Sequence, residues 1–247
     1  MKKDLKMKKL FIVSLGIFLL ALAFLSGAEA IARTYTTNFS LTENPISEGG
    51  NWINGGTTGL DWFNVRTDGT HAHGNTTTGS YTDPTALLTA TWAPNQTVEA
   101  TVYSVNQTAS YYQEVELRLR SSISAHSITG YEILFRCLKT PSAYMEIVRW
   151  NGPVGDFTYL RQYSGSEYGV ANGDVVKATI NGSTITVYIN GVQKGTATDS
   201  TYATGNPGIG FNYGVGSTNG DFGFTNFSAS DEAKAISPPK NLRILAR

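Results

Sequence analysis

The sequence predicts an all-β protein, a β-sandwich of two antiparallel sheets with jelly-roll topology. Two tight hairpins follow one another between residues 174 and 211, at Asn181-Gly182 and Asn190-Gly191, and Asn-Gly between alternating apolar residues is a strong hairpin signal. Helical periodicity is absent after residue 30, where alternating segments recur roughly every eight to fifteen residues between clusters of Gly, Asn, Ser and Thr. There are about thirteen such segments, more strands than an immunoglobulin-type domain has, and this number fits a jelly roll better.

Each expected strand is a short alternating or aromatic-rich segment that ends at turn residues. In chain order the expected strands are 37–41, 60–66, 86–92, 97–105, 113–121, 131–138, 143–150, 158–163, 175–180, 184–189, 192–197, 208–212 and 221–228. Apolar and polar residues alternate from Val176 to Ile180, so the meander has one apolar face. Phenylalanines in the first and last strands indicate one domain over residues 31–230, followed by a linker or tail over 231–247.

The N-terminal 30 residues are predicted to be a signal peptide. A lysine-rich start precedes an apolar run from Leu10 to Leu25, and Ala28-Glu29-Ala30 has the small-x-small pattern of a cleavage site. We therefore expect a secreted protein, extracellular or periplasmic. The apolar run is long for a signal peptide, so a retained N-terminal anchor is the alternative.

The charge of the chain argues against certain partners, and its cysteine content rules out an intrachain disulfide. Without residues 1–30 the chain has 14 basic and 17 acidic residues, which argues against nucleic acid or an anionic membrane surface as a partner. Cys137 is the only cysteine, so no intrachain disulfide can form. It lies at every second position with Tyr131, Ile133 and Phe135, so its side chain points to the same inward face. This predicts a buried, unreactive thiol.

Two neighbouring strands carry charged residues on one face. In segment 113–121 charged residues alternate with valine and leucine, and the charged positions are Glu114, Glu116, Arg118 and Arg120. In the next strand the outward positions are Glu132, Leu134 and Arg136. The patch has two interpretations: a cross-strand salt-bridge ladder that keeps the face solvated, or a ligand site, since carboxylates and guanidinium groups also bind sugar hydroxyls.

Aromatic residues in the following strands are candidates for stacking against sugar rings. Tyr144 and Trp150 alternate with apolar residues in segment 143–150, and Tyr163 ends the next strand. A flat aromatic face beside polar groups suits a pyranose ring, although such residues are also common in cores and rims. Trp52, Trp62 and Trp92 lie among apolar neighbours and are predicted to be structural.

The order of these features resembles a known family. The segments that carry the resemblance are NFSLTENPISEGGNW at the start, ELRLRSS and GYEILFRC in the middle, ITVYINGVQKGTATDSTYATGNPGIGF in the meander and DFGFTNFSAS at the end. Together they resemble the concanavalin A-like lectin/glucanase fold in its laminin-G-like, secreted bacterial form. The resemblance implies a jelly roll with one concave sheet, and a polysaccharide or glycan as the partner, since most members are carbohydrate-binding modules and some are glycoside hydrolases or polysaccharide lyases.

On that resemblance we expect a lectin-like module whose site lies on the concave sheet. The expected binding residues are Glu116, Arg118, Arg120, Glu132, Arg136, Tyr144, Trp150 and Tyr163. A polysaccharide-degrading enzyme that uses Glu114, Glu116 or Glu132 is the first alternative. Hydrolase relatives carry Glu-x-Asp-x-x-Glu where this chain reads EVELRLR, and lyase relatives carry a Gln-x-His that this chain lacks. The second alternative is a non-catalytic surface domain that binds another protein.

The sequence predicts no cofactor, with calcium as a possibility. Several aspartates lie in Gly- and Asn-rich turns, where a hard cation binds carboxylate and backbone oxygens; they are Asp68, Asp174, Asp199 and Asp221. Turn formation alone also explains them. His71 and His73 share a strand face, but a zinc site needs three or four ligands and the sequence offers no evident third.

Overall fold

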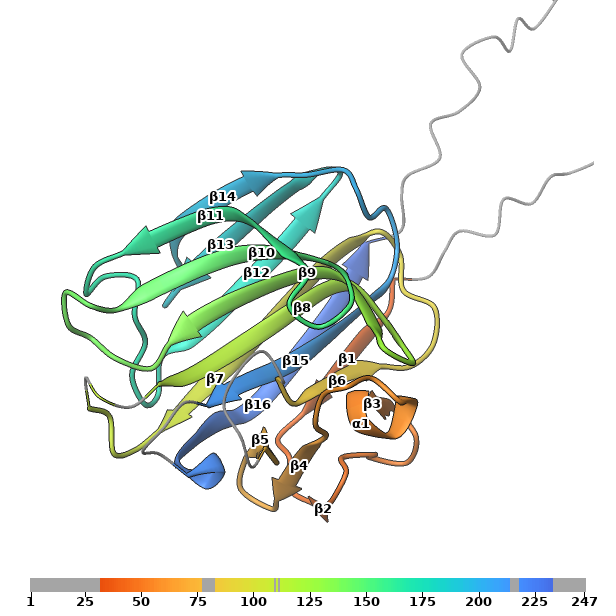
Figure 1. Ribbon diagram of the computed structural model, residues 1–247, viewed down its shortest axis with the longest axis horizontal. Coiled ribbons are helices and arrows are strands. Elements are labelled where there is room, and N and C mark those ends of the chain that lie inside the picture. The colour runs from red at the N-terminus through yellow and green to blue at the C-terminus, as the bar shows by residue number, and fades with distance from the viewer. Residues whose placement is uncertain (1–31, 77–82, 109, 111, 214–217, 233–247) are drawn as a thin grey trace, which may run out of the picture.

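The protein is a sandwich of two antiparallel sheets (Figure 1). The computed structural model describes residues 32–232, apart from 77–82, 109, 111 and 214–217. The predicted signal peptide therefore lies outside the described residues, as does the chain from residue 233. None of the helices in the described residues has the length and apolar character needed to cross a membrane.

The nine-stranded sheet contains the meander. Its order is β14 (Val192–Thr198), β13 (Thr184–Ile189), β12 (Val175–Asn181), β7 (Asn95–Ser104), β16 (Phe222–Glu232), β5 (Ala72–Gly74), β4 (Val65–Asp68) and β2 (Thr42–Glu43), with β1 (Thr34–Thr37) also pairing with β16. Both predicted hairpins are present. Asn190 and Gly191 both have positive φ, as a type I′ turn requires, whereas the first turn uses Gly182 and Ser183 between the paired Asn181 and Thr184.

The seven-stranded sheet carries the charged strands. Its order is β11 (Phe157–Ser164), β10 (Tyr144–Gly152), β9 (Ser127–Arg136), β8 (Gln113–Ser124), β15 (Asn206–Tyr213), β6 (Thr85–Leu88) and β3 (Trp52–Asn54). The prediction of an all-β, two-sheet jelly-roll sandwich is confirmed.

The main core lies between the sheets. Val115, Leu117 and Leu119 of β8 point inward, opposite inward residues of the other sheet such as Val98 and Phe224, and all are buried. Burial of apolar surface contributes roughly 25 cal/mol per Å², so this layer stabilises the fold. Cys137 is buried as predicted, and desolvation raises the pKa of its thiol.

The N-terminal quarter departs most from the predicted strands. Instead of a strand over 60–66, the chain forms the short helix α1 (Gly55–Thr58), a loop, and then β4. The Thr57 and Thr58 hydroxyls bond the Asn54 carbonyl, which favours a helical turn over an extended chain. A second short helical turn, η1 (Asn219–Asp221), precedes β16. The strands β2, β3 and β5 are too short to give a periodic signal.

Candidate functional site

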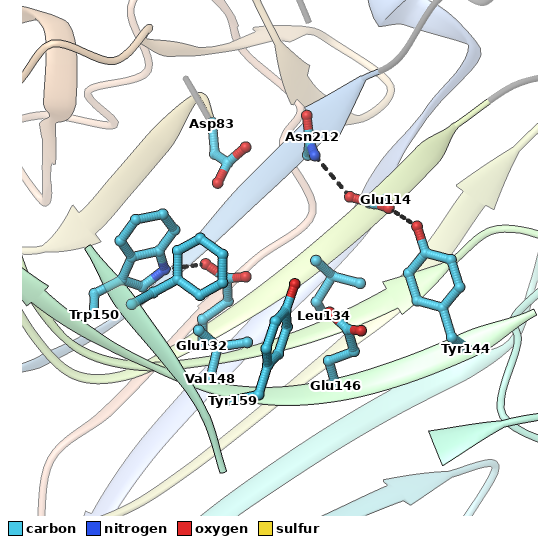
Figure 2. A pocket seen from close by; sticks show the side chains of 11 residues that line it. Asp83, Glu114, Glu132, Leu134, Tyr144, Glu146, Val148, Trp150, Tyr159 and Asn212 are labelled. Atoms are coloured by element: carbon cyan, nitrogen blue, oxygen red, sulfur yellow. Dashed lines mark hydrogen bonds between the residues drawn. The ribbon is translucent and has the colours of Figure 1, made fainter. Parts of the chain in front are cut away.

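The outer face of the seven-stranded sheet, turned away from the core, holds a pocket. The pocket has a volume of about 180 Å³, smaller than the ~300–1,000 Å³ of most small-molecule sites. Figure 2 shows that strands β9, β10, β11 and β15 contribute most of its side chains. The lining residues are Asp83, Glu114, Glu132, Leu134, Tyr144, Glu146, Val148, Trp150, Phe157, Tyr159 and Asn212. We call this the carboxylate pocket.

Strand register explains why these residues meet. Arg118 of β8 lies opposite Glu132 of β9, and Glu132 lies opposite Val148 of β10. Because successive side chains of a strand alternate between faces, the residues two positions away share the same outer face. Glu114 and Glu146 are brought to one surface in this way.

A loop covers one end of this outer face. Trp62, which follows α1, packs edge-on against Trp150 with ring centroids 4.6 Å apart, and its ring lies 5.1 Å from the Arg118 guanidinium carbon. These groups belong to a second buried cluster, separate from the main core. Its members are Leu60, Trp62, Leu87, Ile123, Ile128, Val148 and Trp150. The covered end of the face is therefore buried, whereas the adjoining pocket includes the exposed Tyr159.

Arg118 is fully buried beneath this cover and pairs with carboxylates. Its guanidinium contacts Glu116, lies 2.6 Å from Glu132 Oε2, and lies 4.0 Å from Asp83 Oδ2. Gly210 of β15 makes room for the pair, because a Cβ there would collide with the Glu116 carboxylate. Burial, and then the charge of Glu132, raises the pKa of Glu116; the same two causes raise the pKa of Asp83.

Glu114 lies at the other end of the pocket, in a hydrogen-bonded position. It accepts hydrogen bonds from the Tyr144 hydroxyl and from Asn212 Nδ2, the latter at 2.8 Å (Figure 2). Burial raises the pKa of Glu114 to about 7, although both hydrogen bonds act in the opposite direction. Burial also raises the pKa of Glu146, which accepts a hydrogen bond from Gln162 at 2.8 Å.

The structure brings most of the expected binding residues together, in different roles. Glu132, Tyr144 and Trp150 line the pocket, and Glu116 and Arg118 form the buried ion pair below it. Trp150 is only 2% exposed and donates its Nε1–H to Glu132 at 2.5 Å, so it orients a carboxylate and has no free ring face for a sugar.

Arg136 lies at the margin of the outer face. Its guanidinium carbon lies 4.6 Å from the centre of the Tyr112 ring and 5.4 Å from that of Tyr144, and its Nη1 donates to the Ser142 carbonyl at 3.0 Å. The guanidinium is thus held beside the pocket and does not line it.

The expectation that Arg120 shares the face of Glu116 and Arg118 is wrong. The β8–β9 register shifts after Leu119, and Arg120 has φ of 46°. Such a bulge re-aims the side chain. Arg120 donates instead to three backbone carbonyls elsewhere, those of Pro94, Tyr202 and Gly182, at 2.7, 3.0 and 2.7 Å.

The expectation that Tyr163 joins the site is also wrong, for a similar reason. The β10–β11 register shifts between Ile147 and Val148. Odd-numbered residues therefore face outward at one end of β11 and inward at the other. Tyr159 pairs with Val148 on the outer face, whereas Tyr163 pairs with the buried Met145. The Tyr163 hydroxyl donates to the Thr196 carbonyl of the other sheet at 3.2 Å.

Several pocket residues were absent from the expected set. Tyr159 and Asn212 lie in strands that were predicted, and only the bulge position decides which aromatic faces outward. Glu146 alternates with Met145 and Ile147 in β10, so the sequence pattern placed it on the same face as Tyr144. Phe157 begins β11 one residue before the predicted strand. Asp83 follows a segment without periodicity, and the sequence gives no signal for its position.

Two groups of residues have ligand atoms close enough for a metal ion, among the residues that the structure describes. One is Asp68, His71 and His73; the other is Asp83, Glu116 and Glu132. The two imidazoles have ring centroids 5.0 Å apart and are buried, which lowers the pKa of both histidines. In the second group Arg118 already pairs with Glu116 and Glu132, so a divalent cation would compete with the guanidinium.

The other aspartates considered for calcium are occupied by hydrogen bonds and ion pairs. Asp174 bonds Asn190 and lies 2.8 Å from Lys139 Nζ; Asp199 accepts from Tyr131 and pairs with Arg149; Asp221 caps the turn at Thr218. None of these three belongs to either metal-ligand group of the described residues. Calcium at these turns stays an untested prediction.

Comparison with known proteins gives the fold. No protein-family model matches the chain, and no curated protein matches it. Among solved structures, the carbohydrate-binding module CBM66 from Bacillus subtilis is similar, with a TM-score of 0.51, 14% identity, and coverage of 76% of this chain and 97% of that one. The metal-free Emp46p carbohydrate recognition domain has a TM-score of 0.53, 13% identity, and coverage of 82% and 97%.

A third similar structure is the CBM2 module of the evolved Dit protein from Lactobacillus casei BL23 phage J-1. Its TM-score is 0.54 at 12% identity, with coverage of 83% of this chain and 98% of that one. The chain has the concanavalin A-like lectin fold. At these identities the likeness concerns the fold alone, and function has to be argued from the pocket.

Proposed function

We propose that the protein is a secreted carbohydrate-binding module, and that the carboxylate pocket is its sugar site. Three structures of similar fold are named as carbohydrate-binding or carbohydrate recognition domains. The N-terminal sequence supports export, which would place the module where polysaccharides occur. Because folds host many functions, the proposal depends on the chemistry of the pocket.

The observation that carries the proposal is a partly exposed aromatic surface beside hydrogen-bond acceptors whose orientation is fixed. Tyr159 is 46% exposed and packs edge-on against Phe157, with ring centroids 5.1 Å apart. Glu114 and Glu132 lie in the same pocket and are held by Asn212 and Trp150. A sugar ring has an apolar face that packs on an aromatic ring and hydroxyls that donate to carboxylates, with charge-assisted bonds the stronger ones.

The test is loss of glycan binding when the aromatic surface is removed. Glycan-array screening would identify a ligand, and calorimetry would measure its affinity for wild type, Tyr159→Ala and the matched control Tyr188→Ala. Tyr188 is a partly exposed tyrosine of the nine-stranded sheet. We expect Tyr159→Ala to lose at least about tenfold in affinity, or ~1.4 kcal/mol, and Tyr188→Ala to bind as wild type. Absence of binding to any glycan, or equal losses in both variants, would refute the proposal.

Glycoside hydrolysis at the same pocket is a second candidate, favoured by one observation. A pKa of about 7 suits Glu114 to donate a proton to a leaving-group oxygen near neutral pH. Release of reducing ends from a bound polysaccharide, abolished in Glu114→Gln, would establish hydrolysis. Binding without any release would leave the module non-catalytic. Glu116 is 0% exposed and contacts Arg118, so it is not available to a substrate.

A further inference from the structure

The carboxylate pocket has a strong excess of acidic groups. Four carboxyl side chains line it, and none of its described lining residues is lysine or arginine; the four are Asp83, Glu114, Glu132 and Glu146. Arg118 lies below them, but its two terminal nitrogens already contact Glu116 and Glu132. One guanidinium thus faces several carboxyl groups, and a second, that of Arg136, lies beside Tyr144 at the margin without lining the pocket.

Asp83 is the group with the poorest partners. It is 4% exposed, its Oδ1 has no hydrogen-bond partner among the described residues, and its Oδ2 reaches Arg118 only at 4.0 Å. Figure 2 shows its carboxylate directed into the pocket, toward the side where Glu132 lies. A buried polar oxygen without a partner is costly and unusual in folded proteins. A bound donor group would satisfy it.

We propose that the pocket binds a cationic amino sugar, and that Asp83 receives the ammonium group. An ammonium is a compact cation with three donors and no acceptor, which suits a pocket whose described lining offers four carboxyl groups and no lysine or arginine. This inference rests on the proposed carbohydrate binding and deepens it, because it names the class of sugar. Uronic acids and sulfated sugars are disfavoured, since their anionic groups would meet the same carboxylates.

A divalent metal fits the same groups less well. Calcium takes six to eight oxygen ligands, whereas Glu116 and Glu132 are engaged with Arg118. Burial raises the pKa of Asp83 and of Glu114, as happens to carboxyl groups without an adequate cationic partner. An ammonium at the pocket would act in the opposite direction and favour their ionised forms.

The test uses three β-1,4-linked hexasaccharides that differ only at C2. Cellohexaose has a hydroxyl there, the N-acetylglucosamine hexamer an acetamide, and the glucosamine hexamer an amine that is protonated at slightly acidic pH. Calorimetry on the mature protein should show the glucosamine hexamer binding at least about tenfold more tightly than cellohexaose. The effect corresponds to ~1.4 kcal/mol. An oligogalacturonate should bind more weakly than cellohexaose.

Variants separate the pocket from general attraction of a polycation. Asp83→Asn keeps the shape and removes the charge, and should reduce the preference for the amine to less than about threefold; Glu146→Gln, at a partly exposed residue, gives a second test should Asp83→Asn fold poorly. Glu99→Gln removes an exposed charge from the nine-stranded sheet and should keep the full preference.

Each remaining outcome overturns a specific claim. If all three hexamers bind equally, or if the preference survives in both pocket variants, the amino-sugar inference is overturned while carbohydrate binding stands. If none of these hexamers and no glycan of the array binds, the proposed function fails and the inference fails with it.

Discussion

The outer faces of the two sheets follow the same sequence pattern but lie in opposite surroundings. On the nine-stranded sheet, Lys177 and Thr179 alternate with buried residues and remain partly exposed. On the seven-stranded sheet, Glu116 and Arg118 alternate with buried residues in the same way, yet both are 0% exposed. Alternation therefore specifies which side chains leave the core, but not whether they reach water.

The difference arises from segments that are distant in sequence. Trp62 and Leu60, in the loop after α1, and Asp83, just before β6, lie over the part of the seven-stranded sheet's outer face where Arg118 is located. A surface salt bridge contributes little to stability, whereas a buried one depends on every partner. Charged residues of the same types therefore contribute differently to stability on the two faces.

Removal of the buried guanidinium should produce the largest effect. Arg118→Met leaves Glu116, Glu132 and Asp83 buried without their cation, and breaking such an arrangement typically costs about 3–5 kcal/mol. Lys177→Met on the other face should cost less than ~1 kcal/mol, because its main contact is a cation–π interaction with Tyr188. Urea unfolding measures both. Equal losses would show that the cover does not isolate Arg118 from solvent.

A smaller effect should appear in the pH dependence of stability. Glu114 has a pKa of about 7 in the folded protein and an ordinary value of 4.5. Between these values the unfolded chain loses the proton while the folded protein keeps it, so the free energy of unfolding falls as pH rises through this window. The shift corresponds to a change on the order of 3 kcal/mol.

Comparison of variants isolates this contribution from the other titrating groups. Glu114→Gln cannot ionise, so its stability relative to wild type should rise between about pH 4.5 and 7 and then level off. Glu99→Gln, at an exposed position of the nine-stranded sheet, should run parallel to wild type. Urea unfolding series at several pH values would measure the slopes, and parallel curves for Glu114→Gln would contradict the assignment.

The sequence predicted the sheets well and the pocket only in part, for identifiable reasons. Strands such as β8, β12 and β13 have strict alternation and were found with nearly correct ends. Two register shifts, after Leu119 and at Ile147, changed which residues face outward. A bulge inserts one residue and leaves little trace in a periodic pattern. Arg120 was therefore placed on the wrong face, and Tyr163 was expected at a site that it does not join.

The cover was harder to predict because it depends on contacts between distant segments. Trp62 was expected to be structural, and it is buried, but its position over Arg118 depends on the path of a loop. Asp83 and Asn212 meet the pocket from strands or loops far from β8 in sequence. Gly210 was the clearest indication in the sequence, since glycine within a strand often marks a close approach by another group, here the Glu116 side chain.

The smallest expected effect compares two buried aspartates. Asp231 of β16 accepts backbone hydrogen bonds from Arg33 and Ala93 at 2.6 and 2.7 Å, whereas Asp83 reaches only Arg118, at 4.0 Å. Asp231→Asn should therefore destabilise the fold, by about 1–3 kcal/mol. Asp83→Asn should raise stability by about 1 kcal/mol near pH 8, because it removes one carboxylate from a crowded group. Opposite signs in urea unfolding would mean that Asp83 is kept for a ligand, whereas a loss in both variants would mean that Arg118 needs its charge.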